Sequence, residues 1–136
     1  MSAKIRVLIV DDHDEVRRLL VKLLAQEEDM EIIGKCTNGK ETLVSAALRT
    51  PDVIVMDVRM PIIDGIDAAR MLLKKRSSCK VIIMTLYEQY LAEAMEIGVQ
   101  GYLLKGINID DLAESIRRVH RGEIVIDEIL MSKVEA

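Results

Sequence analysis

The chain has 136 residues, half of them apolar, a length and composition that suit one compact domain with its own core. Its net charge of -4 argues against nucleic-acid binding by this chain alone, because phosphate backbones attract basic surfaces. No apolar run approaches membrane-spanning length, no signal peptide opens the chain, and two cysteines are weak evidence for a disulfide, so we expect a cytoplasmic protein that binds no membrane and keeps its thiols reduced.

The first part of the sequence predicts a strand, a helix, a strand and a helix. Residues 5–10 are apolar and rich in β-branched side chains, which favours a buried strand. The next apolar residues recur at helical spacing and predict one buried helix face: Val16, Leu19, Leu20, Leu23 and Leu24. Residues 30–36 alternate in polarity and carry Glu31 and Lys35, which is typical of an edge strand. The helix after the turn signal Asn38-Gly39 is expected to face inward with Leu43, Ala46 and Ala47.

The second part continues the same alternation. Residues 53–56 predict an uninterrupted apolar strand, and the helix near residues 64–75 is expected to face inward with Ile66, Ala69 and Leu73. Residues 81–84 predict the next strand. The helical spacing after it ends at Gly98 and includes Tyr87, Tyr90, Leu91, Ala94 and Met95. Residues 102–104 predict the fifth strand. Asn108 is expected to cap a last helix that carries Ile109, Leu112, Ala113, Ile116 and Val119.

This alternation predicts an α/β fold in which helices cover both faces of a parallel five-stranded sheet, giving a three-layer sandwich. The fully apolar strands belong in the middle and the amphipathic second strand at an edge. A strand order of 2-1-3-4-5, the flavodoxin-like arrangement, satisfies both demands. Residues 123–136 show no clear partner pattern, so we expect them to be a tail or a truncated linker after a domain that spans residues 1–122.

Polar residues follow four of the predicted strands directly: Asp11-Asp12, Asp57, Thr85 and Lys105. In an open α/β sheet, ligands bind at the carboxyl ends of the strands, where the strand order reverses. The first and third strands are neighbours at that point. We therefore expect Asp11, Asp12 and Asp57 to converge.

Three converging carboxylates repel one another unless a cation neutralises them, and hard oxygen ligands of this kind suit Mg²⁺. The acidic loop after the first strand would repel a bare phosphate, which argues against a nucleotide or flavin site. A carboxylate beside a metal ion can attack a phosphoryl donor and form an acyl phosphate. Lys105 can pair with the phosphoryl oxygens, and Thr85 can donate a hydrogen bond to them.

With these residues, the chain from about Lys4 to Gly122 resembles the receiver domain of two-component response regulators. The motif positions are Asp11-Asp12, Asp57, Met60-Pro61, Asp64-Gly65, Thr85 and Gly101–Lys105. The stretch Asn38–Leu43 and the ending Arg121-Gly122-Glu123 are most similar to the NarL/LuxR-type subfamily, whose receivers precede a LuxR-type helix-turn-helix domain. The resemblance therefore implies a receiver at residues 1–122, which is either a lone receiver or part of a two-domain regulator whose DNA-binding output domain is not present in this chain. We favour the second alternative, because the resemblance is to two-domain regulators.

The resemblance implies a role for each of these positions. Asp57 would accept a phosphoryl group from a sensor histidine kinase in a Mg²⁺-dependent reaction. Asp12 would bind Mg²⁺ directly, Asp11 mostly through water, and the backbone carbonyl of Arg59 would supply another ligand. The other two roles concern the phosphoryl group and the switch. Thr85 and Lys105 would contact the phosphoryl group, and Tyr102 would be the aromatic switch that follows Thr85.

A signalling switch of this kind is not an enzyme in the ordinary sense, although it catalyses its own phosphorylation and slow autodephosphorylation. Its output surface would run from about Tyr87 to Arg121 and can support a homodimer on phosphorylation. Leu86 departs from the family pattern, which has a small residue after Thr85, and could slow phosphotransfer. Arg59 and Tyr87 are expected to flank the path of the hydrolytic water and to set the phosphoryl lifetime.

Two other functions compete with this interpretation. A phosphohydrolase of the haloacid dehalogenase type also uses a strand-end aspartate, but it needs an acidic residue two positions later, where this chain has Arg59. A degenerate receiver would only scaffold partners, and Leu86 is the one feature that suggests it. His13 invites a role as a phosphohistidine or general base, but we expect a surface residue at the start of the first helix.

Overall fold

The computed structural model describes residues 3–75 and 78–135, so Ala136 of the predicted tail lies outside the described residues. Six strands alternate with six helices along the chain. The strands are β1 (Ile5–Val10), β2 (Met30–Cys36), β3 (Val53–Met56), β4 (Lys80–Thr85), β5 (Gly101–Leu104) and β6 (Val125–Ile126). The helices are α1 (Asp14–Leu24), α2 (Gly39–Arg49), α3 (Gly65–Lys74), α4 (Leu91–Ile97), α5 (Ile109–His120) and α6 (Glu128–Glu135).

All strands pair in parallel in one sheet, in the order β2-β1-β3-β4-β5-β6. The predicted 2-1-3-4-5 order is confirmed, and the amphipathic second strand lies at an edge as expected. The sequence analysis did not expect β6. Val125 pairs with Gly101 and Ile126 with Tyr102, so the segment predicted as a tail adds a sixth strand to the sheet.

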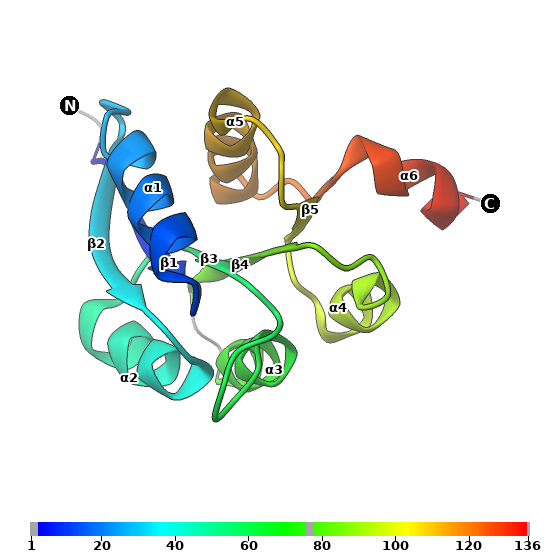
Figure 1. The fold of residues 1–136 in the computed structure, drawn as a ribbon, viewed down its shortest axis with the longest axis horizontal. Coiled ribbons are helices and arrows are strands. Elements are labelled where there is room, and N and C mark those ends of the chain that lie inside the picture. Colours follow the sequence, from blue (N-terminus) through cyan, green and yellow to red (C-terminus); the bar gives the residue numbers. More distant parts are fainter. Residues whose placement is uncertain (1–2, 76–77, 136) are drawn as a thin grey trace.

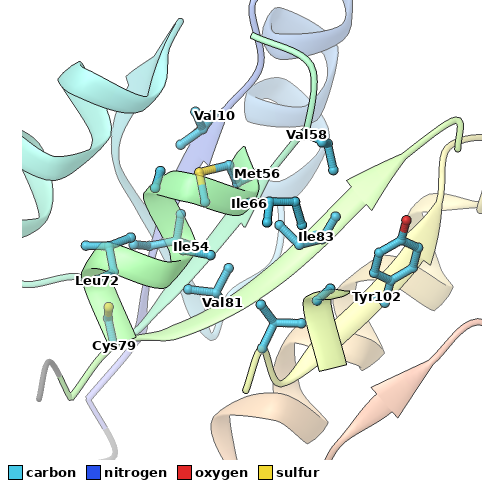
Figure 2. Packing of buried hydrophobic residues seen from close by; sticks show 14 of the residues in the cluster. Val10, Ile54, Met56, Val58, Ile66, Leu72, Cys79, Val81, Ile83 and Tyr102 are labelled. Atoms are coloured by element: carbon cyan, nitrogen blue, oxygen red, sulfur yellow. The ribbon is translucent and has the colours of Figure 1, made fainter. Parts of the chain in front are cut away.

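Helices cover both faces of this sheet (Figure 1), with α1 and α5 on one face and α2, α3 and α4 on the other. Alternate residues of each central strand enter opposite layers, because successive side chains of a strand point to opposite faces. One core cluster joins the sheet to α2–α4 and includes Ile54, Ile83 and Tyr102 (Figure 2). The other joins it to α1 and α5 and includes Val55 and Ile82. Both cores are mainly aliphatic, as the composition predicts.

Local signals determine several of the helix ends. The Asn108 and Gly98 caps were expected, whereas Asn38 was expected only as part of a turn. Asn108 caps α5 by accepting a hydrogen bond from the Asp111 backbone N–H at 2.8 Å. Asn38 caps α2 in the same way with Glu41, at 2.9 Å. Gly98 ends α4 in the left-handed conformation at φ 94°, which a glycine adopts without strain.

Three expectations about helix faces were wrong. Leu19 is 55% exposed, although helical spacing placed it on the buried face of α1. Ala47 is exposed, and Thr42 instead faces the core beside Ala46. Tyr87 lies in the loop before α4, which begins only at Leu91. In each case the apolar spacing alone did not determine which positions lie on a buried helix face.

The C-terminal segment, residues 125–131, is attached to β5 by backbone and side-chain contacts. The Asp127 N–H donates to the Tyr102 carbonyl at 2.8 Å, and the Asp127 carboxylate accepts from the Leu104 N–H at 3.1 Å. Leu130 is fully buried in the cluster that contains Tyr102. These contacts explain why two strand residues suffice to hold β6 in place.

Two further expectations concern the cysteines and membranes. Cys36 and Cys79 are both buried, and neither takes part in a disulfide within the described parts of the chain, so the reduced state of the thiols stays a prediction. Among the described residues, every helix is too short or too polar to cross a membrane.

Candidate functional site

The strand register brings the polar strand ends to one edge of the sheet. Asp11 follows β1, and its N–H donates to the Cys36 carbonyl at 3.1 Å. Asp57 follows β3, and its N–H donates to the Val10 carbonyl at 3.1 Å. The Lys105 N–H donates to the Thr85 carbonyl at 2.8 Å. The carboxyl ends of β1, β3, β4 and β5 therefore meet at the predicted site.

Lys105 joins the two buried carboxylates of the site. Its Nζ lies 2.8 Å from Asp57 Oδ2 and 2.8 Å from Asp11 Oδ2. Burial alone would lower the pKa of Lys105, but the hydrogen bonds and charges of Asp11 and Asp57 outweigh it and raise this pKa above its ordinary value. Lys105 therefore stays protonated and partly neutralises the acidic cluster.

The other carboxylate oxygens are held by backbone amides. Asp57 Oδ1 accepts from the Val58 N–H at 2.7 Å, and Asp11 Oδ1 accepts from the His13 N–H at 2.9 Å. His13 Nδ1 lies 3.0 Å from Asp11 Oδ1 and 3.2 Å from Asp12 Oδ1. His13 is the N-cap residue of α1 with an exposed side chain, as predicted, but its ring also touches the acidic cluster.

The donor set fits a small hard cation. One ligand atom from each of Asp11, Asp12, His13 and Asp57 lies within 4.8 Å of the others. Three of the four offer carboxylate oxygens, which suit Mg²⁺. Asp12 is the most exposed of these three carboxylates and faces solvent, where an ion can enter. The predicted ligand role of the Arg59 carbonyl stays a prediction.

Gly65 allows α3 to begin directly against this site. A Cβ atom at Gly65 would lie 2.0 Å from the Asp57 carbonyl oxygen, a distance that no side chain tolerates. The Gly65 N–H donates to the Val58 carbonyl at 2.7 Å, and Asp64 caps α3. The motif Asp64-Gly65 thus fixes the loop that follows the candidate phosphoacceptor.

Thr85 and Tyr102 are connected through Tyr87. The Tyr87 N–H donates to Thr85 Oγ1 at 3.3 Å, and the Tyr102 hydroxyl donates to the Tyr87 carbonyl. Both Thr85 and Tyr102 are fully buried. Figure 2 shows Tyr102 beside Ile83 in the core cluster. A movement of the Thr85 hydroxyl would therefore reach Tyr102 through a single residue.

Arg59 and Tyr87 lie in contact at the surface near the site. The Arg59 guanidinium lies 3.7 Å from the centroid of the Tyr87 ring, within range of a cation–π interaction. Arg59 Nε also donates to the Tyr90 hydroxyl at 3.2 Å. Leu86, the departure from the family pattern, has an exposed side chain.

Sequence reasoning missed Arg17 and Asp127. Arg17 is buried, and its guanidinium donates to the Asp11 carbonyl oxygen at 2.8 Å. The apolar spacing of this helix includes Val16 but not Arg17, so it gave no signal that Arg17 is buried. Asp127 binds the end of β5, as described above. The only signal for it is the short apolar pair Val125-Ile126 before it, which is too short to predict a strand.

Comparison with known proteins places this geometry in context. Residues 7–117 match the model of the response regulator receiver domain family. The transcriptional regulatory protein YvfU of Bacillus subtilis is 42% identical over 89% of this chain and 62% of its own length. The response regulator GacA of Pseudomonas aeruginosa is 37% identical over 88% of this chain and 56% of its own length. A LuxR-family DNA-binding response regulator from Staphylococcus aureus has a structure with a TM-score of 0.82 and 29% identity, over 85% of this chain and 98% of that one.

The chain therefore spans only about 56 to 62% of the length of these two curated relatives. The rest of each relative lies outside the aligned region, so the similarity concerns only the part of these regulators that this chain matches.

Proposed function

Because this chain belongs to the response regulator receiver domain family, we propose that it is a phosphorylation switch in which Asp57 accepts a phosphoryl group from a sensor histidine kinase. The observation that carries the proposal is the position of Asp57. Its carboxylate is buried between Lys105 and the acidic pair Asp11-Asp12, so a nucleophile, a fixed cation and a metal-binding donor set lie together.

The chemistry follows from these positions. An Asp57 carboxylate oxygen attacks phosphorus, the phosphorus–nitrogen bond of the phosphohistidine breaks, and the imidazole leaves with the electron pair and takes up a proton. Asp11, Asp12 and Asp57 would hold a Mg²⁺ ion, which supplies charge neutralisation for two anionic partners. The Lys105 Nζ lies 2.8 Å from Asp57 Oδ2, so we expect it to pair with the oxygens of a phosphoryl group that Asp57 carries.

The proposed switch then runs through Thr85. Its hydroxyl turns to donate to the phosphoryl group, which releases the Tyr87 N–H, and Tyr102 follows through its bond to the Tyr87 carbonyl. A population shift between two packings needs only a modest difference in interaction free energy. We infer that the affected surface, from Tyr87 to Arg121, then binds a partner or a second copy of the chain.

The relatives support a role in transcription. We infer that the complete regulator carries a LuxR-type DNA-binding domain, because this chain covers only part of its relatives, among them a transcriptional regulatory protein, and because a LuxR-family response regulator shares its fold. The site works in the cytoplasm, where the histidine kinase presents its phosphohistidine.

The test is the intact mass of the chain after incubation with a small phosphodonor and Mg²⁺. Wild type is expected to gain one hydroxylamine-labile phosphoryl group, and chelation of the metal is expected to prevent it. Asp57→Asn should gain none, and Asp110→Asn, which removes an acidic residue from the first turn of α5, should behave as wild type.

Each alternative predicts a different result. A folded wild-type chain that gains no mass and does not bind Mg²⁺ would support the scaffold. Sustained turnover of a small phosphoester at a stoichiometry far above one would support the phosphohydrolase instead, despite the presence of Arg59 at the position of its general acid.

A further inference from the structure

Arg17 is a buried arginine that lies directly behind the acidic cluster. It is only 7% exposed. Its Nη1 donates to the Asp11 carbonyl oxygen at 2.8 Å, and its Nη2 contacts the Asp14 carboxylate. Its Nε is buried and has no hydrogen-bond partner within the described parts of the chain. Burying a guanidinium is costly, so these two contacts are expected to serve a purpose that an apolar residue would not.

The contact to the Asp11 carbonyl controls the peptide that joins Asp11 to Asp12. This peptide is planar, so fixing its carbonyl oxygen also fixes the direction in which the chain enters Asp12. The other groups of Asp11 are already held. Its N–H bonds to the Cys36 carbonyl, Oδ1 to the His13 N–H and Oδ2 to Lys105. Arg17 supplies the remaining restraint. Asp12 is the more exposed carboxylate, and within residues 3–75 and 78–135 its side chain contacts only the His13 ring.

The contact to Asp14 holds the guanidinium in this orientation. Asp14 is on the first turn of α1, three residues before Arg17, so the pair spans one helical turn. The planar fork of an arginine gives each contact its own nitrogen, Nη1 for the carbonyl and Nη2 for the carboxylate, at a fixed separation. A lysine would have to serve both acceptors from one flexible nitrogen. The Asp14 charge also offsets the Arg17 charge, so the guanidinium repels a nearby cation less than a lone positive charge would.

We propose that Arg17 is a positioning residue for the magnesium site, which locks the Asp11–Asp12 peptide so that both carboxylates face Asp57. The proposal rests on the metal site of the proposed function but not on phosphorylation. Positioning and a purely electrostatic role predict opposite changes in Mg²⁺ affinity when Arg17 is removed. If Arg17 acted only through its charge, its removal would strengthen Mg²⁺ binding, whereas loss of positioning weakens it.

The experiment measures Mg²⁺ affinity by calorimetry on the full chain, without a phosphodonor, for wild type, Arg17→Met and Arg18→Met. Arg18 is the matched control, because it is exposed on the same helix and its replacement removes the same charge. Loss of an outer-shell partner typically weakens metal binding about 10- to 100-fold, and we expect Arg17→Met to fall in this range. Arg18→Met should stay close to wild type.

An unchanged or tighter Mg²⁺ affinity in folded Arg17→Met would overturn the proposal. If Arg17→Met does not fold, Arg17→Lys decides. The lysine keeps the charge but loses the rigid fork that holds the Asp11 carbonyl, so weaker Mg²⁺ binding supports positioning and an unchanged affinity contradicts it. Amide hydrogen exchange provides a second readout, because the Asp12 and His13 amides should exchange faster in metal-free Arg17→Met than in metal-free wild type.

Phosphorylation is measured separately, so the two proposals can fail independently. A chain that binds Mg²⁺ with an affinity that depends on Arg17, yet never phosphorylates Asp57, would leave positioning intact and refute the switch. If Arg17→Met is phosphorylated normally and binds Mg²⁺ with wild-type affinity, the switch stands and the positioning role of Arg17 is refuted.

Discussion

Tyr102 combines full burial with a hydroxyl that has one defined partner, the Tyr87 carbonyl. Burial disfavours the tyrosinate and raises the pKa of Tyr102 to about 12. An unfolded chain loses this proton near the ordinary value of 10.0, so between these values the folded state holds the proton and the unfolded state does not. This contribution of Tyr102 is fully present below pH 10 and is lost as the pH rises toward 12.

The Tyr102→Phe variant tests this pH dependence. Wild type should lose on the order of 2 kcal/mol more stability than the variant between pH 10 and 12, measured by denaturant unfolding. At neutral pH the variant should be less stable by about 1 kcal/mol, because the hydrogen bond to Tyr87 is absent. Parallel stability curves for the two proteins above pH 10 would show that Tyr102 ionises normally.

Arg59 and Tyr87 are expected to control how long the phosphoryl group survives. Their stacked side chains lie beside the loop that follows Asp57, so we expect them to restrict the approach of water. Arg59→Ala should lose the phosphoryl group severalfold faster, measured by mass after the donor is removed. Arg70→Ala, which removes a half-buried arginine that pairs with Asp67 and Glu93, provides the control. Equal lifetimes in Arg59→Ala, Tyr87→Ala and wild type would refute this role.

At the scale of single residues, the sequence predicted which side chains meet but not all the groups that orient them. Asp11, Asp57 and Lys105 could be placed together because each directly follows an apolar strand. Arg17 could not be identified in this way, because its burial depends on how α1 packs beside the Asp11 carbonyl rather than on its spacing.

In the C-terminal segment, residues 125–131, two neighbouring side chains have opposite environments, and we expect only the buried one to hold the segment in place. Leu130 is fully buried against the core, whereas Ile129 is 68% exposed. Leu130→Ala should destabilise the chain by about 2 kcal/mol or more, since a buried leucine is lost. Ile129→Ala should change stability by less than about 0.5 kcal/mol. Thermal unfolding and exchange of the Asp127 amide measure both effects. Equal small effects would show that Leu130 does not hold the segment.

Elements with a clear apolar or periodic pattern were predicted well, whereas the two-residue β6 was not predicted. The structure confirms most predicted ranges within one or two residues, including those of β1, β3, β4 and β5 and of the capped helices α2 and α5. β6 has only two residues and gains its stability from the neighbouring Tyr102 and Leu104 backbone, which no local pattern reports. The late start of α4 also follows from contacts that are distant in sequence. The Tyr87 ring stacks on Arg59, and the Tyr87 carbonyl accepts from the Tyr102 hydroxyl.

For the molecule as a whole, Arg117 ties α5 to the turn before β2. It contacts Glu27 at 2.6 Å and Asp29 at 2.7 Å, and its hydrogen bond lowers the pKa of Asp29. Arg117→Gln should cost about 1 kcal/mol at low salt and less at high salt, because such charges are screened. Since the pKa of Asp29 is depressed, this difference should also fade as the pH falls below its ordinary value of 3.8.

Arg121→Gln is the control for this prediction, because Arg121 makes longer contacts, at 3.3 and 3.6 Å. Urea unfolding at two salt concentrations measures the difference. A salt-independent loss in Arg117→Gln would indicate packing of its aliphatic stem rather than ion pairing. The strand order and layering of the whole molecule were predictable without such contacts, because they follow from the alternation of apolar runs.

The sixth strand also affects the solubility of shortened versions of this protein. β5 would otherwise end the sheet with unpaired backbone groups, and the Val125 and Asp127 amides satisfy the Gln100 and Tyr102 carbonyls there. An uncovered edge invites strands from other molecules to add to it. A chain cut after Gly122 would carry every residue of the proposed phosphorylation site and still be expected to aggregate, so the shortest well-behaved version should extend beyond Leu130.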